Sequence, residues 1–351
     1  MCIRDRAKGE GVGLVEAEMN EFHRLGGKID YETEARDLIV KEGKVVGVKC
    51  HSPKGEIEIE ADSVVLGCGG FEANPDLRRK FMSEKWVQSK VRGTRHNMGR
   101  GIEMALNIGA KFHGVSDGCH ATPMDKNMPN YGNPDIPYIE RKHYRKICYF
   151  LGVMLNAKGE RFEDEGINFR NYTYAQFGRS LLNQPGNCAW QIFDKKVEHL
   201  LYSEYRFWDA SYVEANTLEE LVEKLEGVDS AKALKTLKEY NAAVDESVDF
   251  DPTILDGKST KGLALNKTNW ANKFDTPPFK AYPVTCGITF TYGGLHVDKN
   301  AQVLNENGEK IEGLFACGEL VGGVFYNGYP GGSGLTSGAV FGRLAGYTAA
   351  S

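Results

Sequence analysis

The segment from residue 313 to residue 351 carries the residues whose types and order best suit ligand binding. A short apolar strand at residues 314–316 is followed by Glu319 and by a loop of six glycines that leads into a helix near Leu335. Glycines let backbone N–H groups approach a planar ligand closely, and a helix start offers unpaired N–H donors. The pattern indicates a cradle for a planar, electron-rich ligand, although a glycine-rich turn before an amphipathic helix would look the same.

A second apolar run also ends at glycines. The sequence EIEIEADSVVLGCGG alternates at first and then becomes continuously apolar at residues 64–66, just before Gly69 and Gly70. A buried strand that runs into glycines is typical of an α/β sheet with a ligand at the carboxyl end of the strand.

The elements that must position these segments follow from the hydrophobic pattern. Apolar residues at helical spacing predict helices at residues 11–25, 101–110, 217–225, 233–244 and 333–350. Strands are predicted at residues 28–32, in a hairpin over 37–50 that turns at Glu42-Gly43, at 64–66, around 288–298 and 301–313, and at 314–316.

The stretch at residues 119–285 differs from its surroundings, because it holds polar turns and two helices and closes at Pro277-Pro278, which resembles a linker. We therefore predict an α/β fold in which residues 7–118 and 286–351 form one domain and residues 119–285 an inserted α+β domain. The insertion would lie across the carboxyl ends of the strands, where a substrate cleft forms.

Composition narrows the class of protein. Of the 351 residues, 41% are hydrophobic and 26% charged, which is a globular mixture, and no apolar stretch is long enough to span a bilayer. A net charge of −5 gives no reason to expect nucleic acid or an anionic membrane as a partner. The eight cysteines are scattered without CxxC spacing, which predicts no metal site and favours a reducing, cytoplasmic location.

Five motifs in one order carry a family resemblance. SVVLGCGGFEAN, NAKGERFEDE, TYGGLHVD, GLFACGE and YPGGSGLTSGAVFGRLAG resemble the fumarate reductase/succinate dehydrogenase flavoprotein superfamily. DEGINFRNYTYAQFGR, AWQIFD and YPVTCGITFTYGGL are most similar to tricarballylate dehydrogenases. The resemblance implies FAD as cofactor, a Rossmann-like FAD-binding domain and a substrate-capping domain at residues 119–285.

The amino terminus departs from that family. Its GxGxxG dinucleotide fingerprint follows a first strand, whereas here Gly9, Gly11 and Gly13 have the wrong spacing and no preceding strand, so we interpret them as a loop before a helix. Residues 1–6 resemble a spurious leader. We expect an N-terminally truncated chain whose FAD-binding domain lacks its first βαβ unit.

The resemblance assigns cofactor contacts by position. Glu319 matches the residue that binds the ribityl chain, and the family's Gly-Asp-Gly aspartate falls on Arg100, which puts that contact in doubt. The other matching cofactor positions are Gly69, Gly70, Ser333, Gly334 and Leu335.

The resemblance also implies a set of substrate residues. His120 matches the family's first histidine, and Arg170 matches the arginine that moves a proton, with one extra residue of spacing after Glu165. The second histidine falls on Thr289 or Phe290, and the second arginine falls on Tyr329, which can donate a hydrogen bond to a carbonyl or carboxyl group. The basic run Arg141, Lys142, His143 and Arg145 could meet further carboxylates or be a solvated loop.

We therefore expect a flavoenzyme that dehydrogenates or reduces a C–C bond beside a carboxyl group in a small di- or tricarboxylate, with Arg170, His120 and Tyr329 at the substrate. The neutral residues at two clamp positions make fumarate itself a poor candidate. One alternative is a 3-ketosteroid-type Δ-dehydrogenase, and another is a truncated fragment without activity. The sequence does not indicate which electron-transfer partner reoxidises the flavin.

Overall fold

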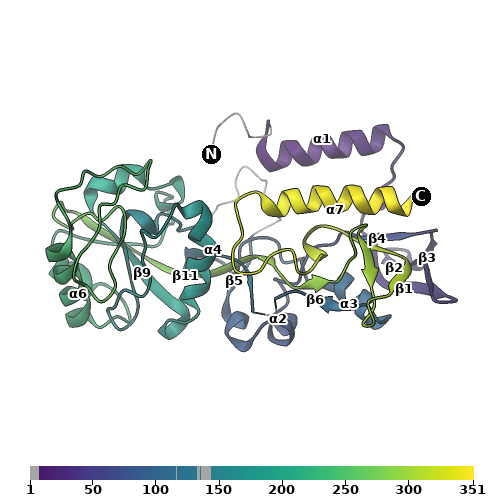
Figure 1. Ribbon diagram of the computed structural model, residues 1–351, viewed down its shortest axis with the longest axis horizontal. Coiled ribbons are helices and arrows are strands. Elements are labelled where there is room, and N and C mark those ends of the chain that lie inside the picture. Colours follow the sequence, from purple (N-terminus) through teal and green to yellow (C-terminus); the bar gives the residue numbers. More distant parts are fainter. Residues whose placement is uncertain (1–7, 116, 133–134, 136–143) are drawn as a thin grey trace.

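The computed structural model describes residues 8–115, 117–132, 135 and 144–351. Figure 1 shows two lobes side by side along the long axis of the molecule. The first lobe (residues 8–115 and 294–351) contains both ends of the described chain, and the second lobe (residues 144–278) contains the middle of the sequence. Together they form a mixed α/β fold.

The helices are α1 Glu10–Arg24, α2 Pro75–Phe81, α3 Arg100–Asn107, α4 Arg170–Leu181, α5 Leu218–Glu223, α6 Ser230–Ala243 and α7 Ser333–Ala349. The strands are β1 Glu34–Lys41, β2 Lys44–Ser52, β3 Gly55–Glu60, β4 Val64–Leu66, β5 Lys90–Val91, β6 Phe112–His113, β7 Cys119–Asp125, β8 Val153–Leu155, β9 Cys188–Phe193, β10 Val213–Ala215, β11 Phe279–Thr291, β12 Gly294–Leu295, β13 Gln302–Leu304 and β14 Lys310–Ala316.

Two three-stranded sheets, the short pair β12-β6 and a shared core build the first lobe. Strands β1, β2 and β3 form an antiparallel meander, and a second sheet has the order β13-β14-β4, in which β4 and β14 run parallel. Both sheets contribute to one buried cluster with α3, whose members include Val45, Leu66, Ile102, Leu295 and Leu314. The cluster fixes the carboxyl ends of β4 and β14 side by side.

The second lobe is built on the sheet β10-β11-β9-β8, to which β5 and β7 add through β11. Helices α5 and α6 cover it, and Thr217 caps α5 by accepting a hydrogen bond from the Glu220 N–H at 3.1 Å. The apolar side chains between sheet and helices are fully buried and include Val153, Ile192, Leu221, Leu237 and Ala281.

Strand β11 connects the lobes. Its first part pairs with β10 and β9, and its last part pairs with β5 and β7. Figure 1 shows this long strand passing from the second lobe toward the first. Pro277 and Pro278, joined by a cis peptide bond, lead directly into β11, and the expected domain boundary at residues 285–286 falls inside it.

Two local predictions were wrong. Residues 28–32 form no strand, because the chain turns there and Glu32 adopts a left-handed backbone with φ 52°. Gly11 and Gly13 lie inside α1 rather than in a loop before it, whereas Gly9 is the left-handed N-cap of that helix with φ 80°. None of the helices in the described ranges is long and apolar enough to cross a membrane.

Candidate active site

The parallel pairing of β4 with β14 brings two glycine-containing turns together. Leu66 lies opposite Ala316, and the Cys317 N–H donates to the Leu66 carbonyl at 2.9 Å, so the chain leaves both strands at the same edge. A Cβ on Gly70 would lie only 2.3 Å from Oε1 of Glu319. Gly70 and Glu319, which the sequence assigns to one ligand, therefore touch.

Glu319 is held in place by β11. Its Oε1 accepts hydrogen bonds from the Thr291 N–H at 2.7 Å and from the Thr291 hydroxyl at 3.2 Å. Burial, and next the charge of Glu72, raises the pKa of Glu319 well above its ordinary value. Burial likewise raises the pKa of Glu72, whose Oε1 accepts from Asn97 at 2.6 Å and whose Oε2 is buried without a partner among the described residues. The charge of each carboxylate thus disfavours a second charge beside it, and burial acts in the same direction.

The first turn of α7 is open at its N-terminus. Gly332 is the N-cap, with φ 88°, and as a glycine it offers no side chain to cap the first N–H groups of the helix. The Ser333 hydroxyl instead donates to the Pro330 carbonyl at 2.6 Å, and Leu335 is 72% exposed. This turn therefore presents donors and an apolar side chain at the surface.

These features fit a flavin. Glu319 has one oxygen fixed by Thr291 and is only partly buried, which suits a carboxyl group that accepts from a ribityl hydroxyl. The open start of α7 suits the electron-rich edge of an isoalloxazine ring. Arg100, which falls on the family's aspartate, is exposed and ion-pairs with Glu34 at 3.7 Å. Gly69, Gly70, Glu319, Ser333, Gly334 and Leu335 are the residues that would hold the group.

His120 is a buried histidine with no protein partner. It lies on β7 opposite Phe290 of β11, is 4% exposed, and neither ring nitrogen has a hydrogen-bond partner among the described residues. Burial, and next the positive charge of Arg92, lowers the pKa of His120 to about 3. The imidazole is therefore neutral at pH 7, with one N–H donor and one acceptor for a ligand.

Two tyrosines enclose this histidine. The ring of Tyr329 lies 4.2 Å from the His120 ring, and the ring of Tyr174 meets it edge-on at 4.9 Å. A Cβ on Gly334 would lie 2.0 Å from the Tyr329 hydroxyl oxygen, so Tyr329 reaches from the histidine to the start of α7. The sequence analysis did not identify Tyr174. Its spacing of four residues from Arg170 would have placed it on the same face of a helix as Arg170.

Arg170 is the first residue of α4. Its Nε donates to the Tyr202 hydroxyl at 2.6 Å, and its guanidinium lies over the Tyr202 ring at 4.8 Å. The charge of Arg170 acts on Tyr174, the residue that touches His120. The structure thus places His120 against Tyr174 and Tyr329, while the Arg170 side chain contacts Tyr202 and acts on Tyr174 through its charge.

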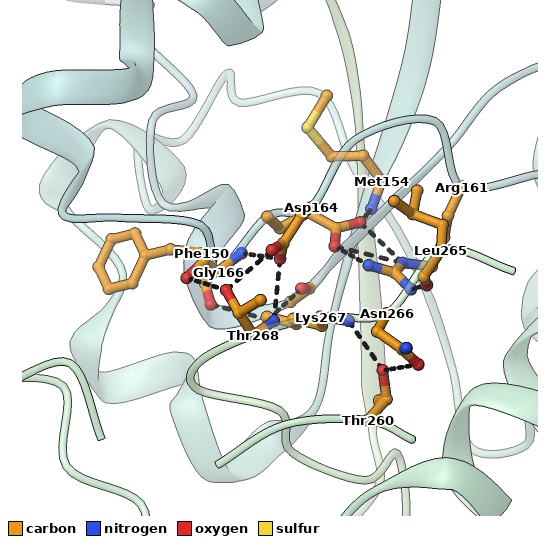
Figure 2. Close-up of polar contacts among 12 residues, drawn as sticks. Phe150, Met154, Arg161, Asp164, Gly166, Thr260, Leu265, Asn266, Lys267 and Thr268 are labelled. Carbon is orange, nitrogen blue, oxygen red and sulfur yellow. Dashed lines mark hydrogen bonds and ion pairs between the residues drawn. The ribbon is translucent and has the colours of Figure 1, made fainter. Parts of the chain in front are cut away.

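The GERFEDEG motif fixes the loop before α4 (Figure 2). Arg161 and Glu165 form a buried ion pair, and Glu165 also accepts from the Met154 N–H at 2.8 Å. Asp164 accepts from the Gly166 N–H at 2.9 Å and from the Thr268 hydroxyl at 2.8 Å. These bonds tie residues 161–166 to residues 265–268 and thereby set where Arg170 begins its helix.

Lys267 completes the same cluster. It is fully buried and donates to the carbonyls of Phe150 at 2.8 Å and Gly152 at 2.7 Å, as Figure 2 shows. Burial lowers the pKa of Lys267 to about 8. None of these hydrogen bonds and ion pairs of the described residues involves His120. The cluster therefore holds the loop before α4 in place and does not itself contact a ligand at His120.

Two further arginines face the site. The Arg92 Nη1 donates at 3.4 Å to the hydroxyl of Thr289, which is one of the two residues on which the family's second histidine falls. Burial, and next the charge of Arg145, lowers the pKa of Arg92 to about 10. Arg145 forms an ion pair with Glu204, while Arg141, Lys142 and His143 lie outside the described residues. No sequence pattern pointed to Arg92. Within the described residues, no cluster of His, Cys, Asp and Glu side chains could hold a metal ion.

Comparison with known proteins gives consistent matches. Residues 2–335 match the family described as FAD binding domain. The chain is 29% identical over 351 residues to an NADH:acrylate oxidoreductase of Vibrio harveyi, covering 97% of this chain and 32% of that protein. It is 27% identical to a 3-oxosteroid 1-dehydrogenase of Mycobacterium tuberculosis, covering 96% of this chain and 62% of that protein.

A solved structure of a flavoprotein also matches this fold. The open conformation of a flavocytochrome c3 fumarate reductase matches with a TM-score of 0.73 and 26% identity, covering 98% of this chain and 56% of that chain. The chain thus spans between one third and two thirds of the length of these relatives. Since the family match covers nearly the whole sequence, the chain belongs to the FAD-binding domain family, within the fumarate reductase/3-ketosteroid dehydrogenase superfamily of flavoproteins.

Proposed function

We propose that this chain carries the active site of an FAD-dependent oxidoreductase that dehydrogenates or reduces the C–C bond next to a carboxyl group in a small di- or tricarboxylate such as tricarballylate. In this proposal the first lobe is the FAD-binding part, with a Rossmann-like sheet, and the second lobe is the substrate cap. A cytoplasmic location and an electron-transfer partner of unknown kind are parts of the same proposal.

One observation carries the proposal. A buried, neutral histidine with two unpartnered nitrogens lies between Tyr174 and Tyr329, in a place where the charges of Arg92 and Arg170 both act. Buried polar groups are normally hydrogen-bonded, so unpartnered nitrogens in a cationic surrounding suit a bound carboxylate.

Each residue has a role that its contacts support. When bound, FAD would supply the acceptor or donor of a hydride equivalent. Arg170 exchanges the proton of the neighbouring substrate carbon through its Nη groups, because its Nε is engaged by Tyr202. His120 and Tyr329 donate hydrogen bonds to the substrate carboxyl group, which stabilises the negative charge that develops beside it in the transition state.

The alternative of a 3-ketosteroid-type dehydrogenase has its own support. Phe290, Tyr292, Phe325 and Tyr329 form a continuous aromatic cluster, with ring centroids 4.8–6.4 Å apart. Such a surface suits an apolar ring system, and one relative is described as a 3-oxosteroid 1-dehydrogenase. Arg92 and Arg170 argue for the carboxylate, because a steroid offers no charge to pair with them.

The test has two parts. The purified chain is loaded with FAD, and the absorbance of the flavin near ~450 nm is followed without oxygen as tricarballylate, succinate or 4-androstene-3,17-dione is added. The proposal is supported if a carboxylate bleaches the flavin of the wild type and the rate of bleaching is about 10²–10⁴-fold lower in R170Q. The flavin of the exposed control R206Q should bleach at the wild-type rate. Bleaching by the steroid alone selects the alternative.

Calorimetry extends the test to protein that retains no FAD. If tricarballylate binds to the wild type and H120Q weakens this binding, the carboxylate site is supported directly. A chain that holds no flavin and binds neither class of compound is a fragment without activity, and the proposal is then wrong.

A further inference from the structure

Arg92 is placed beside the site by strand pairing. Residues 90 and 91 pair with Gly287 and Ile288 in parallel, and the Arg92 N–H donates to the Ile288 carbonyl at 2.7 Å. On its other edge, the same strand β11 pairs with β7, so that Phe290 lies opposite His120. Arg92 and His120 therefore flank one short piece of β11, residues 288–290, from its two sides.

The Arg92 side chain turns back toward this piece of strand, because its Nη1 donates to the Thr289 hydroxyl at 3.4 Å. Its positive charge is felt by three groups of the site, His120, Tyr174 and Tyr329. A guanidinium that acts on all three lies close to the cluster that they form.

Among the described residues Arg92 makes no ion pair, and the carboxylate of Glu204 acts on its charge only from a distance. The other arginines near it are engaged differently, since Arg145 is ion-paired with Glu204 and Arg170 donates to Tyr202. A partly buried cation that makes no direct ion pair is costly, and a bound anion lowers that cost. The guanidinium of Arg92 is therefore suited to a negatively charged ligand.

Resting on the function proposed above, we propose that Arg92 is the carboxylate-binding arginine of this site and determines its specificity for anionic substrates. The two protein groups expected from the sequence to bind the carboxyl group, His120 and Tyr329, are both neutral and supply hydrogen bonds only. Arg92 supplies the full charge through a planar fork that matches a carboxylate. Its partner Thr289 is one of the two residues, with Phe290, on which the family's second histidine falls.

Isothermal titration of the chain with tricarballylate tests this role. We expect R92Q to weaken binding about 10–100-fold, as for loss of a charge-assisted hydrogen bond. R92K keeps the charge but loses the fork, so a loss of about 3–10-fold is expected. R95Q is the matched control, because Arg95 lies three residues away, is half exposed and ion-pairs with Asp135 at 3.3 Å; it should bind within about twofold of wild type.

The outcomes separate the two proposals. If wild type and R92Q bind tricarballylate equally, the role of Arg92 is wrong and the proposed function stands. If wild type binds no carboxylate while the steroid binds, the proposed function itself is wrong, and this role with it. Circular dichroism and the unfolding midpoint establish that each variant is folded. If R92Q does not fold, the affinities of R92K and R95Q for tricarballylate are compared instead, and equal affinities would mean that the role of Arg92 is wrong.

Discussion

At the scale of single residues, burial sets the charge of His120. Its folded pKa of about 3 lies below the ordinary value of 6.5, since burial and Arg92 both disfavour the imidazolium. The unfolded chain therefore binds more protons between these values. The contribution of neutral His120 to stability is complete above pH ~6.5 and is lost as the pH falls toward 3.

A substitution tests this. Between pH 6.5 and pH 5, wild type should lose about 2 kcal/mol more of its free energy of unfolding than H120Q does, because each unit of pKa difference is worth about 1.4 kcal/mol. Urea unfolding at both pH values measures the difference. H23Q, at an exposed position on α1, should keep the wild-type pH dependence; equal slopes for wild type and H120Q would contradict the assignment of a neutral histidine.

At the scale of elements, the glycine at position 70 leaves room for the side chains of Glu319 and Thr291 beside the ends of β4 and β14. A methyl group there would lie 2.3 Å from both Oε1 of Glu319 and the Thr291 hydroxyl. Such a contact forces Glu319 off its position or opens the strand ends. The glycine is thus required by packing between two turns rather than by a left-handed backbone.

We expect G70A to lower the free energy of unfolding by about 1–3 kcal/mol, the usual cost of overpacking, and to weaken FAD binding. The control is G346A in α7, where an added Cβ meets no atom within 4 Å. It should stabilise the chain by up to ~1 kcal/mol, because alanine favours a helix over glycine. Denaturant unfolding and FAD fluorescence titration measure both effects, and an unchanged G70A would show that the two turns move apart freely.

The loop before α4 depends on the buried pair Arg161–Glu165, whose side chains are 4% and 0% exposed. E165Q leaves an unpaired buried cation and should cost about 3–5 kcal/mol of unfolding free energy. E219Q breaks an exposed pair with Lys238 and should cost less than about 1 kcal/mol. Thermal and urea unfolding of both variants check this, and equal effects would mean that water reaches the cluster in Figure 2.

At the scale of the whole molecule, β11 makes the lobes interdependent. It pairs with four other strands, and its last residues hold Glu319 through Thr291 while its first residues pack in the core of the second lobe. A disturbance in the second lobe should therefore reach the site at the edge of the first.

Hydrogen exchange of E165Q tests this coupling. We expect faster amide exchange than in wild type in the second lobe and also in β11 and β14, since one strand shares both cores. E219Q is the control and should leave β14 unchanged. Faster exchange confined to residues 150–170 would mean that the lobes open independently.

The sequence by itself determined the features that depend on local chemistry. The hairpin at Glu42-Gly43, the Thr217 cap and the helix after the last glycines follow from turn and capping residues within a few positions. The contact between Gly70 and Glu319 was predictable because parallel strands end at one edge of a sheet. Helix spacing could also have shown Tyr174.

Only the tertiary structure decided the rest. Arg92 joins His120 through strand pairing on both edges of β11, a register that no local pattern contains. The neutrality of His120, the raised pKa of Glu319 and the lowered pKa of Arg92 depend on which groups exclude water from one another. Residue types indicated where a ligand binds, whereas burial and long-range pairing decided where the charge lies.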